Sequence, residues 1–482
     1  MFFRQIFEEG LAQASYIVGC TETETALVVD PRRDIDVYLR IAQENDLKIS
    51  AVTETHIHAD FLSGARELAA ATGATLCLSG CGGPEWTYGP SGSSAPVRLL
   101  HDGELIEVGR VLVAVRHVPG HTPEHLMFIV TDGAVSSNPM IAMTGDFVFV
   151  GDLGRPDLLE KVVGVSGGAE RGARSMFASL RSVFSSVPDY VQLWPGHGAG
   201  SACGKALGAV PASTAGYERL TAWWAPYVAS GDEAGFVREL LDGQPDAPTY
   251  FARMKRLNRD GAPLLGKLPE ARRLDAAGLA AAVGAGAVVV DSRRKKAFKA
   301  GHPIGALAIA DESSFSTRAA WFVDPEKPIV LIATPDHVEG LVRALIRVGL
   351  DKVAGFVDAG DTSALSAMGT ATLDSIDLAA ARKRWESGEA VIIDVRNGGE
   401  WRHGHIPGAI HTPASTLGAM LDSVPRDKPL LVHCAGGNRS VAASSVLLAN
   451  GFTRVSDVAD GFDGWEAAGY PVDREDEAAK IA

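Results

Sequence analysis

The sequence predicts a mixed α/β protein built from three domains. Its 482 residues exceed the length of an ordinary single domain and fit about three of them. In the first half, strand-like apolar runs end on polar residues, a pattern typical of layered sheets. In the second half, residues 287–309 resemble residues 390–412, and both segments alternate apolar runs with helical patterns. This alternation favours parallel sheets covered by helices.

Composition limits the kind of partner that we expect. Hydrophobic residues make up 46% of the chain and charged residues 22%, as in an ordinary globular protein. A net charge of −14, spread along the chain, argues against nucleic acid or an anionic membrane as a partner. No apolar run reaches about 18 residues, so we expect no transmembrane helix. The sequence leaves a homo-oligomer open.

Cysteine usage and the N-terminus predict a cytoplasmic protein. The five cysteines are an odd and sparse set, unlike a disulfide framework. The N-terminal stretch MFFRQIFEEGLAQ places acids where a signal peptide needs an apolar core. We therefore expect a reducing compartment, in which thiols stay free for chemistry.

The first candidate site is the stretch THIHADF at residues 55–61. It follows a strand-like run and precedes a helical pattern. His56 and His58, at the end of a strand, can aim their imidazoles at one point, and Asp60 adds a carboxylate. The motif predicts a metal site, and a solvated polar turn is the simpler alternative.

Three further polar residues follow strand-like segments in the same half of the chain. His121 lies in PGHT between two strands, Asp146 follows the apolar run MIAMTG, and His197 ends YVQLWPGHG. A ligand candidate therefore ends each of four strands. A sheet sandwich concentrates such strand ends along one edge, which predicts a single site there.

In their order, the motifs HIHAD, GHT, TGD and PGHG resemble the metallo-β-lactamase superfamily, specifically its glyoxalase II-like and persulfide dioxygenase branch. The resemblance covers residues 1–262 and implies a four-layer αββα sandwich with metal at one edge. Two-metal members carry a histidine directly after the aspartate of the first motif, where this chain has Phe61. Because phenylalanine cannot bind metal, the resemblance implies a single metal held by His56, His121 and Asp146.

Two imidazoles and one carboxylate are the ligands of non-haem Fe(II) oxygenases, so the resemblance implies one Fe(2+) per chain. The open coordination positions would admit a persulfide sulfur and O2 together. His58 is then expected to orient a ligand or a bound water, with direct metal binding as the less favoured alternative. Asp60 and His197 are expected to lie at the site without a cation of their own.

Two residues near these motifs have alternative roles. In VGDLGRPDL, Arg155 either binds a substrate carboxylate or anionic sulfur product, or forms an ordinary ion pair with Asp157. In GAGSACG, Cys203 is either a second persulfide carrier or a packed thiol, and we leave it outside the catalytic set. Residues 214–260 are expected to form helices that cover the site.

The second half contains an internal repeat after a linker with the sequence PLLGKLPEARRLD. Asp291 in VVVDSR matches Asp394 in VIIDVR, and the matching continues through GHPIGA and GHIPGA. We therefore expect two α/β domains, at residues 270–365 and 372–476, which we call the first and second repeat.

The second repeat carries a candidate nucleophile, Cys434, which ends an apolar strand in HCAGGNRSV. The backbone amides that follow and the positive end of the next helix favour an anionic sulfur, and Arg439 closes the loop. We expect Cys434 and Arg439 to be catalytic, with a buried structural cysteine as the alternative. Substrate contacts are expected from four neighbours: Gly436, Gly437, Asn438 and Ser440.

The loop from Cys434 to Arg439 is one residue shorter than the loop with which cysteine phosphatases enclose phosphate. This shorter loop, together with GHIPGAI and GFDGW, resembles rhodanese sulfurtransferases. In the first repeat, Ala333 stands at the position of Cys434, and no arginine closes the loop. The first repeat is therefore expected to be catalytically silent and to act as a spacer or a docking surface.

Together the two resemblances imply a fusion of a persulfide dioxygenase with a rhodanese. The metal domain would oxidise a low-molecular-weight thiol persulfide with O2 to sulfite and thiol. Cys434 would carry sulfane sulfur between persulfide or sulfite and thiosulfate or thiol. One alternative is a glyoxalase II-type thioester hydrolase with an appended sulfurtransferase, and the other is a non-enzymatic sulfur carrier or sensor. The thiol is left open, as glutathione, coenzyme A, cysteine or another.

Overall fold

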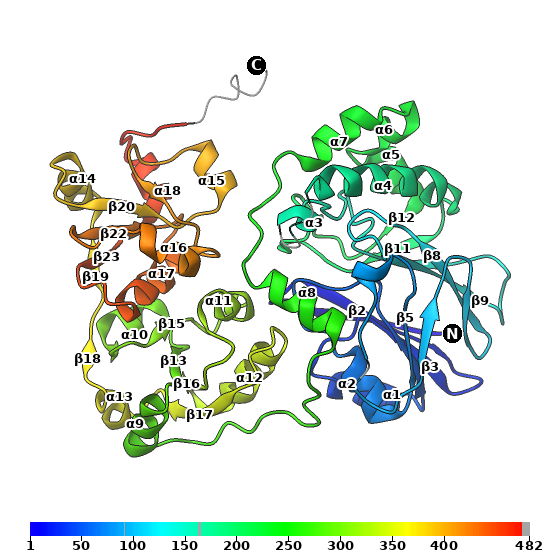
Figure 1. The fold of residues 1–482 in the computed structure, drawn as a ribbon, viewed down its shortest axis with the longest axis horizontal. Helices are drawn as coiled ribbons and strands as arrows, with labels where there is room; N and C mark the ends of the chain where they lie inside the picture. Colours follow the sequence, from blue (N-terminus) through cyan, green and yellow to red (C-terminus); the bar gives the residue numbers. More distant parts are fainter. Residues whose placement is uncertain (91, 162–163, 165, 475–482) are drawn as a thin grey trace. The chain divides into compact units, whose positions relative to one another are not determined.

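The chain folds into two compact units, shown in the computed structural model of Figure 1. The structure describes residues 1–90, 92–161, 164 and 166–474. The first unit contains Met1–Leu268 with Ile346–Gly349, and the second contains Pro269–Leu345 with Leu350–Ala482. The last two residues of the domain predicted at 372–476 lie outside the described residues. Within the described ranges, no helix is both long and apolar enough to cross a membrane.

The first unit contains two six-stranded sheets, in which strands adjacent in sequence are adjacent in space. Most neighbours are antiparallel, whereas β3 to β6 and the pair β10–β11 are parallel. The strands of the first sheet are β1 (Phe2–Glu8), β2 (Gln13–Cys20), β3 (Thr25–Val29), β4 (Lys48–Thr53), β5 (Thr75–Ser79) and β6 (Val97–Leu100). Those of the second are β7 (Leu105–Val108), β8 (Val111–His117), β9 (Leu126–Asp132), β10 (Ile141–Gly145), β11 (Gln192–Pro195) and β12 (Ser213–Thr214).

The two sheets pack face to face and are covered by helices on their outer faces (Figure 1). Val18 of the first sheet and Val113 of the second belong to one buried cluster between the sheets. Leu68 packs in a second cluster outside the first sheet, and Leu180 packs in a third outside the second sheet. The predicted four-layer αββα sandwich is thereby confirmed.

Helices of the first unit follow from their apolar spacing and their ends. In α4 the buried residues Ala173, Met176 and Leu180 recur every three or four positions, which gives the helix one apolar face. In α7 the side chain of Asp232 accepts the N–H of Gly235 and so caps the first turn. The helices are α1 (Asp36–Glu44), α2 (Ala65–Thr72), α3 (Leu158–Lys161), α4 (Gly168–Ser182), α5 (Ala215–Thr221), α6 (Ala225–Ser230), α7 (Glu233–Leu241) and α8 (Phe251–Asp260), with 3-10 turns η1 (Pro84–Trp86) and η2 (Phe184–Ser186).

The second unit contains two parallel sheets, as the sequence predicted. Their strand orders are β15-β13-β16-β17 and β19-β23-β22-β20-β21, and β14 (His302–Pro303) of the first repeat pairs antiparallel with β18 (Thr370–Ala371) in the segment between the repeats. The first sheet contains β13 (Val288–Asp291), β15 (Leu307–Ala308), β16 (Ile329–Ala333) and β17 (Val353–Asp358). The other contains β19 (Asp374–Ile376), β20 (Val391–Asp394), β21 (Ile410–His411), β22 (Leu430–His433) and β23 (Val455–Val458).

Helices cover both parallel sheets. In the first repeat they are α9 (Ala276–Gly284), α10 (Lys295–Ala300), α11 (Phe315–Phe322), α12 (Val338–Ile346) and α13 (Thr362–Ser366), with the 3-10 turn η3 (Pro335–His337). In the second repeat they are α14 (Leu378–Glu386), α15 (Gly398–His403), α16 (Leu417–Met420), α17 (Asn438–Ala449) and α18 (Gly461–Ala467), with the 3-10 turn η4 (Leu421–Ser423).

The two repeats share one internal ion pair in nearly the same geometry. Arg293 contacts both oxygens of Asp291, and a terminal nitrogen lies 2.6 Å from Oδ2. Arg396 contacts Asp394 in the same way, at 2.7 Å. Each arginine also donates to a carbonyl eight residues later, at 2.9 Å in the first repeat and 2.7 Å in the second. The repeat found in the sequence is therefore also a repeat of contacts.

Candidate metal centre and sulfur-transfer loop

The predicted metal ligands meet at one edge of the sandwich. His56 follows β4, His121 lies between β8 and β9, and Asp146 follows β10. Oδ2 of Asp146 lies 3.6 Å from Nε2 of His121 and 4.0 Å from Nε2 of His56. All three side chains are buried, and their candidate ligand atoms lie within 4.8 Å of one another.

Hydrogen bonds on the far side of each ring turn Nε2 of both histidines toward Asp146. Nδ1 of His56 lies 3.0 Å from Oγ1 of Thr55, and Nδ1 of His121 lies 3.0 Å from the carbonyl oxygen of Arg155. Burial lowers the pKa of His56 and of His121, which favours the neutral imidazole that binds metal.

The Asp146 carboxylate has no hydrogen-bond partner among the described residues, although it is completely buried. An isolated buried carboxylate is costly unless a cation compensates its charge. Together with the two imidazole nitrogens, it forms the donor set of a divalent transition metal. The residues present therefore fit a resident metal ion.

His58 points to a different partner, Asp30, which the sequence analysis did not select. Nε2 of His58 lies 3.0 Å from Oδ1 of Asp30, and the other oxygen of Asp30 accepts the hydroxyl of Thr55 at 2.8 Å. Burial lowers the pKa of His58, but the charge and hydrogen bond of Asp30 outweigh burial and raise it to about 9. The expected role of His58 in orienting a ligand or a bound water stays a prediction.

His125 is a second residue of the site that the sequence analysis missed. Its Nε2 accepts the backbone N–H of Asp146 at 3.0 Å, and its ring stacks on His56 with centroids 4.8 Å apart. Burial holds the pKa of His125 well below its usual value, so the ring stays neutral and can accept this bond. The signal in the sequence was a second histidine four residues after His121.

Phe61 occupies the position at which two-metal relatives have a histidine. Its side chain is fully buried, with its ring centroid 4.5 Å from that of His58. An apolar ring thus fills this side of the site.

A second group of metal-binding residue types lies beside the first. His197, Asp60 and Cys203 are all buried, and their ligand atoms lie within 4.8 Å of one another. Nε2 of His197 lies 3.4 Å from Asp60 and 3.5 Å from Oδ1 of Asp146. Burial, followed by the charges of Asp60 and Asp146, raises the pKa of Cys203 well above its usual value. The sequence analysis weighed Cys203 as a persulfide carrier or a packed thiol and left it outside the catalytic set.

The contacts of Arg155 favour the ion-pair alternative over substrate binding. Two nitrogens of the guanidinium donate to Asp157, at 2.7 and 2.6 Å. The third nitrogen, Nη1, donates to the carbonyl oxygen of Ala202 at 3.1 Å, and Nη2 also donates to that of Pro245 at 2.5 Å. Because the side chain is completely buried and its donors are engaged, Arg155 braces the wall of the site.

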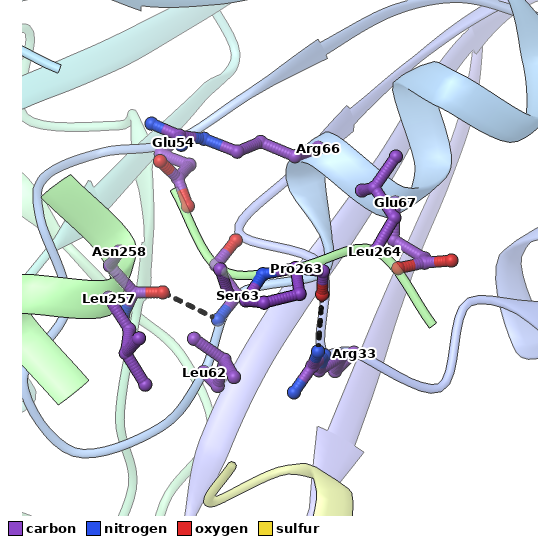
Figure 2. Close-up of a pocket in the computed structure, with 11 residues that line it drawn as sticks. Arg33, Glu54, Leu62, Ser63, Arg66, Glu67, Leu257, Asn258, Pro263 and Leu264 are labelled. Carbon is purple, nitrogen blue, oxygen red and sulfur yellow. Dashed lines mark hydrogen bonds between the residues drawn. The ribbon is translucent and has the colours of Figure 1, made fainter. Parts of the chain in front are cut away.

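Helix α8, in the segment expected to cover the site, is hydrogen-bonded to the turn that contains His58 and Phe61. Nδ2 of Asn258 donates to the carbonyl oxygens of His58 and Phe61, at 2.8 and 2.7 Å. Its Oδ1 accepts the N–H of Ser63 at 2.9 Å, drawn in Figure 2. Figure 2 also shows a pocket between this turn and α8, which is lined by Ser63, Arg66 and Asn258 among other residues.

In the second unit, Cys434 lies where β22 passes into α17, as predicted. The N–H of Gly437 donates to Sγ of Cys434 at 3.1 Å, and the thiol lies 3.6 Å from Oγ of Ser440. Gly437 has φ 86°, a conformation that favours glycine and turns its N–H toward the sulfur. The second glycine of the motif, Gly437, thus has a structural reason.

Arg439 closes the loop through Glu400, a residue that the sequence analysis missed. Both terminal nitrogens of Arg439 lie 2.6 Å from the two carboxylate oxygens of Glu400. Glu400 also caps α15 by exchanging hydrogen bonds with Asn397. The positive charge of Arg439 is therefore balanced beside Cys434 by a rigidly held carboxylate.

The GFDGW motif packs directly against the backbone of the Cys434 loop. Gly461 has φ 58°, and a Cβ there would lie 2.1 Å from the carbonyl oxygen of Ala435 and 2.3 Å from that of Cys434. The next N–H, of Phe462, donates to the Cys434 carbonyl at 2.8 Å. Only glycine allows this close approach of two backbones.

The corresponding loop of the first repeat is built differently. Ala333 ends β16 and is buried, in agreement with its predicted match to Cys434. It is followed by the 3-10 turn η3, in which Pro335 and Asp336 replace the two glycines.

Comparisons with known proteins support the assignment of both parts. The family model Metallo-beta-lactamase superfamily matches residues 9–197, and the model Rhodanese-like domain matches residues 377–468. A solved structure described as a metallo-beta-lactamase from Staphylococcus aureus subsp. aureus COL is 37% identical, with a TM-score of 0.65, and the match covers 74% of this chain and 98% of that one. The chain therefore belongs to the metallo-β-lactamase superfamily. It carries in addition a C-terminal rhodanese-like domain.

Two further similarities are more distant. A probable hydroxyacylglutathione hydrolase from Schizosaccharomyces pombe (strain 972 / ATCC 24843) is 29% identical over 188 residues, or 38% of this chain. The match spans 62% of the length of that relative. The crystal structure of ETHE1 from Myxococcus xanthus is 24% identical, with a TM-score of 0.42, over 54% of this chain and 99% of that one.

Proposed function

We propose that this protein oxidises low-molecular-weight thiol persulfides with O2 at a mononuclear iron site and transfers sulfane sulfur through Cys434. The main support is the buried carboxylate of Asp146, which has no hydrogen-bond partner among the described residues and faces Nε2 of His56 and of His121. The apolar ring of Phe61 in place of a further ligand favours one metal over two.

The three ligands have distinct supports that keep them in place without substrate. His56 is held through Thr55 and Asp30, and the backbone of Asp146 is held by His125. When bound, Fe(II) would supply the activation of O2 and a coordination position for the persulfide sulfur. Phe61 and the other buried walls limit the access of water to the site.

The proposed oxidation balances without a further reductant. A persulfide RSSH, one O2 and one water give the thiol RSH, sulfite and two protons. The terminal sulfur is oxidised, O2 is reduced, and the S–S bond breaks with the inner sulfur leaving as the thiol. The product sulfite is a substrate for the second site.

At the second site, the Cys434 thiolate is proposed to attack the outer sulfur of a thiol persulfide, whose S–S bond breaks as the inner sulfur leaves as the thiol. Cys434 then holds the sulfane sulfur as a persulfide. The lone pair of sulfite attacks the outer sulfur, the S–S bond breaks, and its electron pair remains on Cys434 as a thiolate. The N–H of Gly437, 3.1 Å from Sγ, is placed to stabilise this anion. The products are thiosulfate and the regenerated cysteine.

A second candidate function is a thioester hydrolase with an appended sulfurtransferase. The group Asp60, His197 and Cys203 would give a second cation three protein donors beside Asp146, as a two-metal hydrolase would need. The S. pombe relative, described as a probable hydroxyacylglutathione hydrolase, favours the same chemistry.

An oxygen electrode separates these functions. Iron-loaded protein is expected to consume O2 with persulfides of glutathione, coenzyme A or cysteine, and to leave a glutathione thioester intact. Thioester hydrolysis without O2 uptake would replace the dioxygenase by the hydrolase. Stoichiometric iron without turnover of either substrate would instead favour a sulfur carrier or sensor.

A further inference from the structure

The first repeat, which lacks the nucleophile, contacts the Cys434 loop of the second repeat directly. Nζ of Lys295, on α10, donates to the carbonyl oxygen of Gly436 at 3.2 Å. The N–H of Ala308 donates to Oγ of Ser445 on α17 at 2.9 Å. Figure 1 shows α10 beside α17 in the second unit. These contacts are more specific than a spacer between two domains requires.

A second lysine of α10, Lys299, is linked to the nucleophile through two other side chains. Nζ of Lys299 lies 2.7 Å from Oδ2 of Asp457, which is buried. The other oxygen of Asp457 accepts the hydroxyl of Ser440 at 2.6 Å, and this hydroxyl oxygen lies 3.6 Å from the thiol of Cys434. The first repeat therefore fixes the position of a group that touches the sulfur.

A small pocket lies between the two repeats beside this loop. Lys295, Glu312 and Arg318 of the first repeat line it together with Asn438 and Val441 of the second. Both residues of the second repeat lie in the first turn of α17. The pocket thus combines cations of one repeat with the start of the helix that follows the nucleophile of the other.

Three cations line this pocket: Arg293 is paired with Asp291, whereas Lys295 and Arg318 are less neutralised than Arg439. Arg439 is held by two short bonds to Glu400, whereas the one ion pair of Arg318 among the described residues is with Glu312, at 3.4 Å. Lys295 pairs with no carboxylate in the described part of the chain. The pocket wall therefore carries net positive charge.

The guanidinium of Arg318 is also electrostatically coupled to the nucleophile. It is buried, and burial lowers its pKa, whereas the charges of Glu312 and, more weakly, of Cys434 raise it. Such coupling acts over short range in a partly buried site.

We propose that Arg318 and Lys295 of the first repeat form the binding site for the sulfur oxyanion, sulfite or thiosulfate, that reacts at Cys434. Tetrahedral and pyramidal oxyanions match the fork of an arginine and the point charge of a lysine. This role rests on the proposed sulfurtransferase function and names the residues that recognise its anionic substrate. The repeat without a nucleophile is then half of the active site.

The test measures how fast Cys434 is alkylated by anionic iodoacetate and by neutral iodoacetamide in the reduced full-length protein. Mass spectrometry of the Cys434 peptide separates this thiol from the other cysteines. Arg318→Gln is expected to lower the iodoacetate-to-iodoacetamide rate ratio about fivefold, because one nearby charge is lost. Lys295→Gln should lower the ratio as well, and high salt should reduce the ratio of the wild type.

Three variants control this measurement. Arg343→Gln removes the same charge from α12 of the first repeat, where Arg343 pairs with Glu339 outside the pocket, and should leave the ratio unchanged. Glu312→Gln removes the partner of Arg318 and should raise the ratio. Arg318→Lys keeps the charge and should keep most of the ratio, which guards against a loss caused by misfolding.

An unchanged ratio in folded Arg318→Gln and Lys295→Gln would overturn the proposal, and so would an equal fall in Arg343→Gln. Steady-state transfer from thiosulfate to cyanide then tests the underlying function. Arg318→Gln should raise the KM for thiosulfate more than it lowers kcat. A lowered alkylation ratio in a protein without any transferase activity would retain the anion site and refute the sulfurtransferase.

Discussion

The imidazole of His125 accepts the backbone N–H of Asp146 at 3.0 Å and is the partner that fixes this stretch of backbone. His125 would not bind the proposed metal itself. It holds the backbone of Asp146, whose carboxylate would be a ligand. Its geometry requires the Nε2 atom to be unprotonated, in agreement with the low pKa that burial imposes on His125.

The first prediction concerns this bond. His125→Ala is expected to weaken metal binding about 10- to 100-fold, as the loss of a residue that supports a ligand typically does. Competition with a chelator measures the affinity. His125→Asn, whose side-chain oxygen can accept the same N–H, should lose less, and equal losses in both variants would assign the effect to packing.

The second prediction separates the two activities. His121→Ala removes a proposed ligand from the first unit and should abolish O2 uptake and retained iron. Transfer of sulfur from thiosulfate to cyanide should persist at near wild-type rate, because Cys434 and its contacts lie in the second unit. Loss of both activities in a folded variant would contradict this separation.

The third prediction is one metal per chain, predominantly iron. The Phe61 ring leaves the second group of donors, Asp60, His197 and Cys203, without the histidine of two-metal relatives. Elemental analysis of protein purified without chelators checks the stoichiometry. Two equivalents that fall to one in Cys203→Ser would place a cation in the second group, and higher activity with zinc than with iron would refute the oxygenase.

The fourth prediction couples the two sites through sulfite. Persulfide and O2 should give thiosulfate as a major product in the intact protein and mainly sulfite in Cys434→Ser. Iron content and O2 uptake should survive, since the change touches none of the metal ligands. Chromatography at early times limits the uncatalysed reaction of sulfite with persulfide. The same thiosulfate fraction in both proteins would mean that the sites act separately.

The fifth prediction concerns the silent loop. Ala333→Cys in a Cys434→Ser background should not restore sulfur transfer, because η3 supplies no glycine N–H directed at the new sulfur. Val338 stands where the second repeat has Arg439, so no guanidinium closes this loop either. A thiosulfate-to-cyanide assay checks the double variant, and clear activity there would disprove the interpretation.

Much of the first site could be predicted from sequence because its ligands end strands. His56, His121 and Asp146 each follow an apolar run, and sheet geometry brings such ends together. Their supports were harder to find. The role of His125 depends on which of its ring atoms faces Asp146, and that of Asp30 on how its carboxylate meets His58 and Thr55, which the spacing of these residues does not reveal.

In the second unit, too, the reactive residue could be predicted from the sequence, whereas the residues that support it could not. The Cys434 loop could be predicted because its residues are consecutive. Glu400 could not, because it reaches Arg439 from a helix distant in the sequence. The contacts of Lys295 and Arg318 depend on how the two repeats pack, which periodicity does not encode. The sequence suggested a spacer or a docking surface, whereas in the structure Lys295 and Arg318 of the first repeat line a pocket beside the Cys434 loop.

The ion pair that both repeats keep, Asp291 with Arg293 and Asp394 with Arg396, has an evolutionary consequence. It fastens a strand to the turn that follows the next helix, and it involves neither Ala333 nor Cys434. A duplicated gene could thus lose its cysteine by a few substitutions while the daughter domain still folded. Without a catalytic role, that domain could then be selected for the contacts that its surface makes with the other repeat.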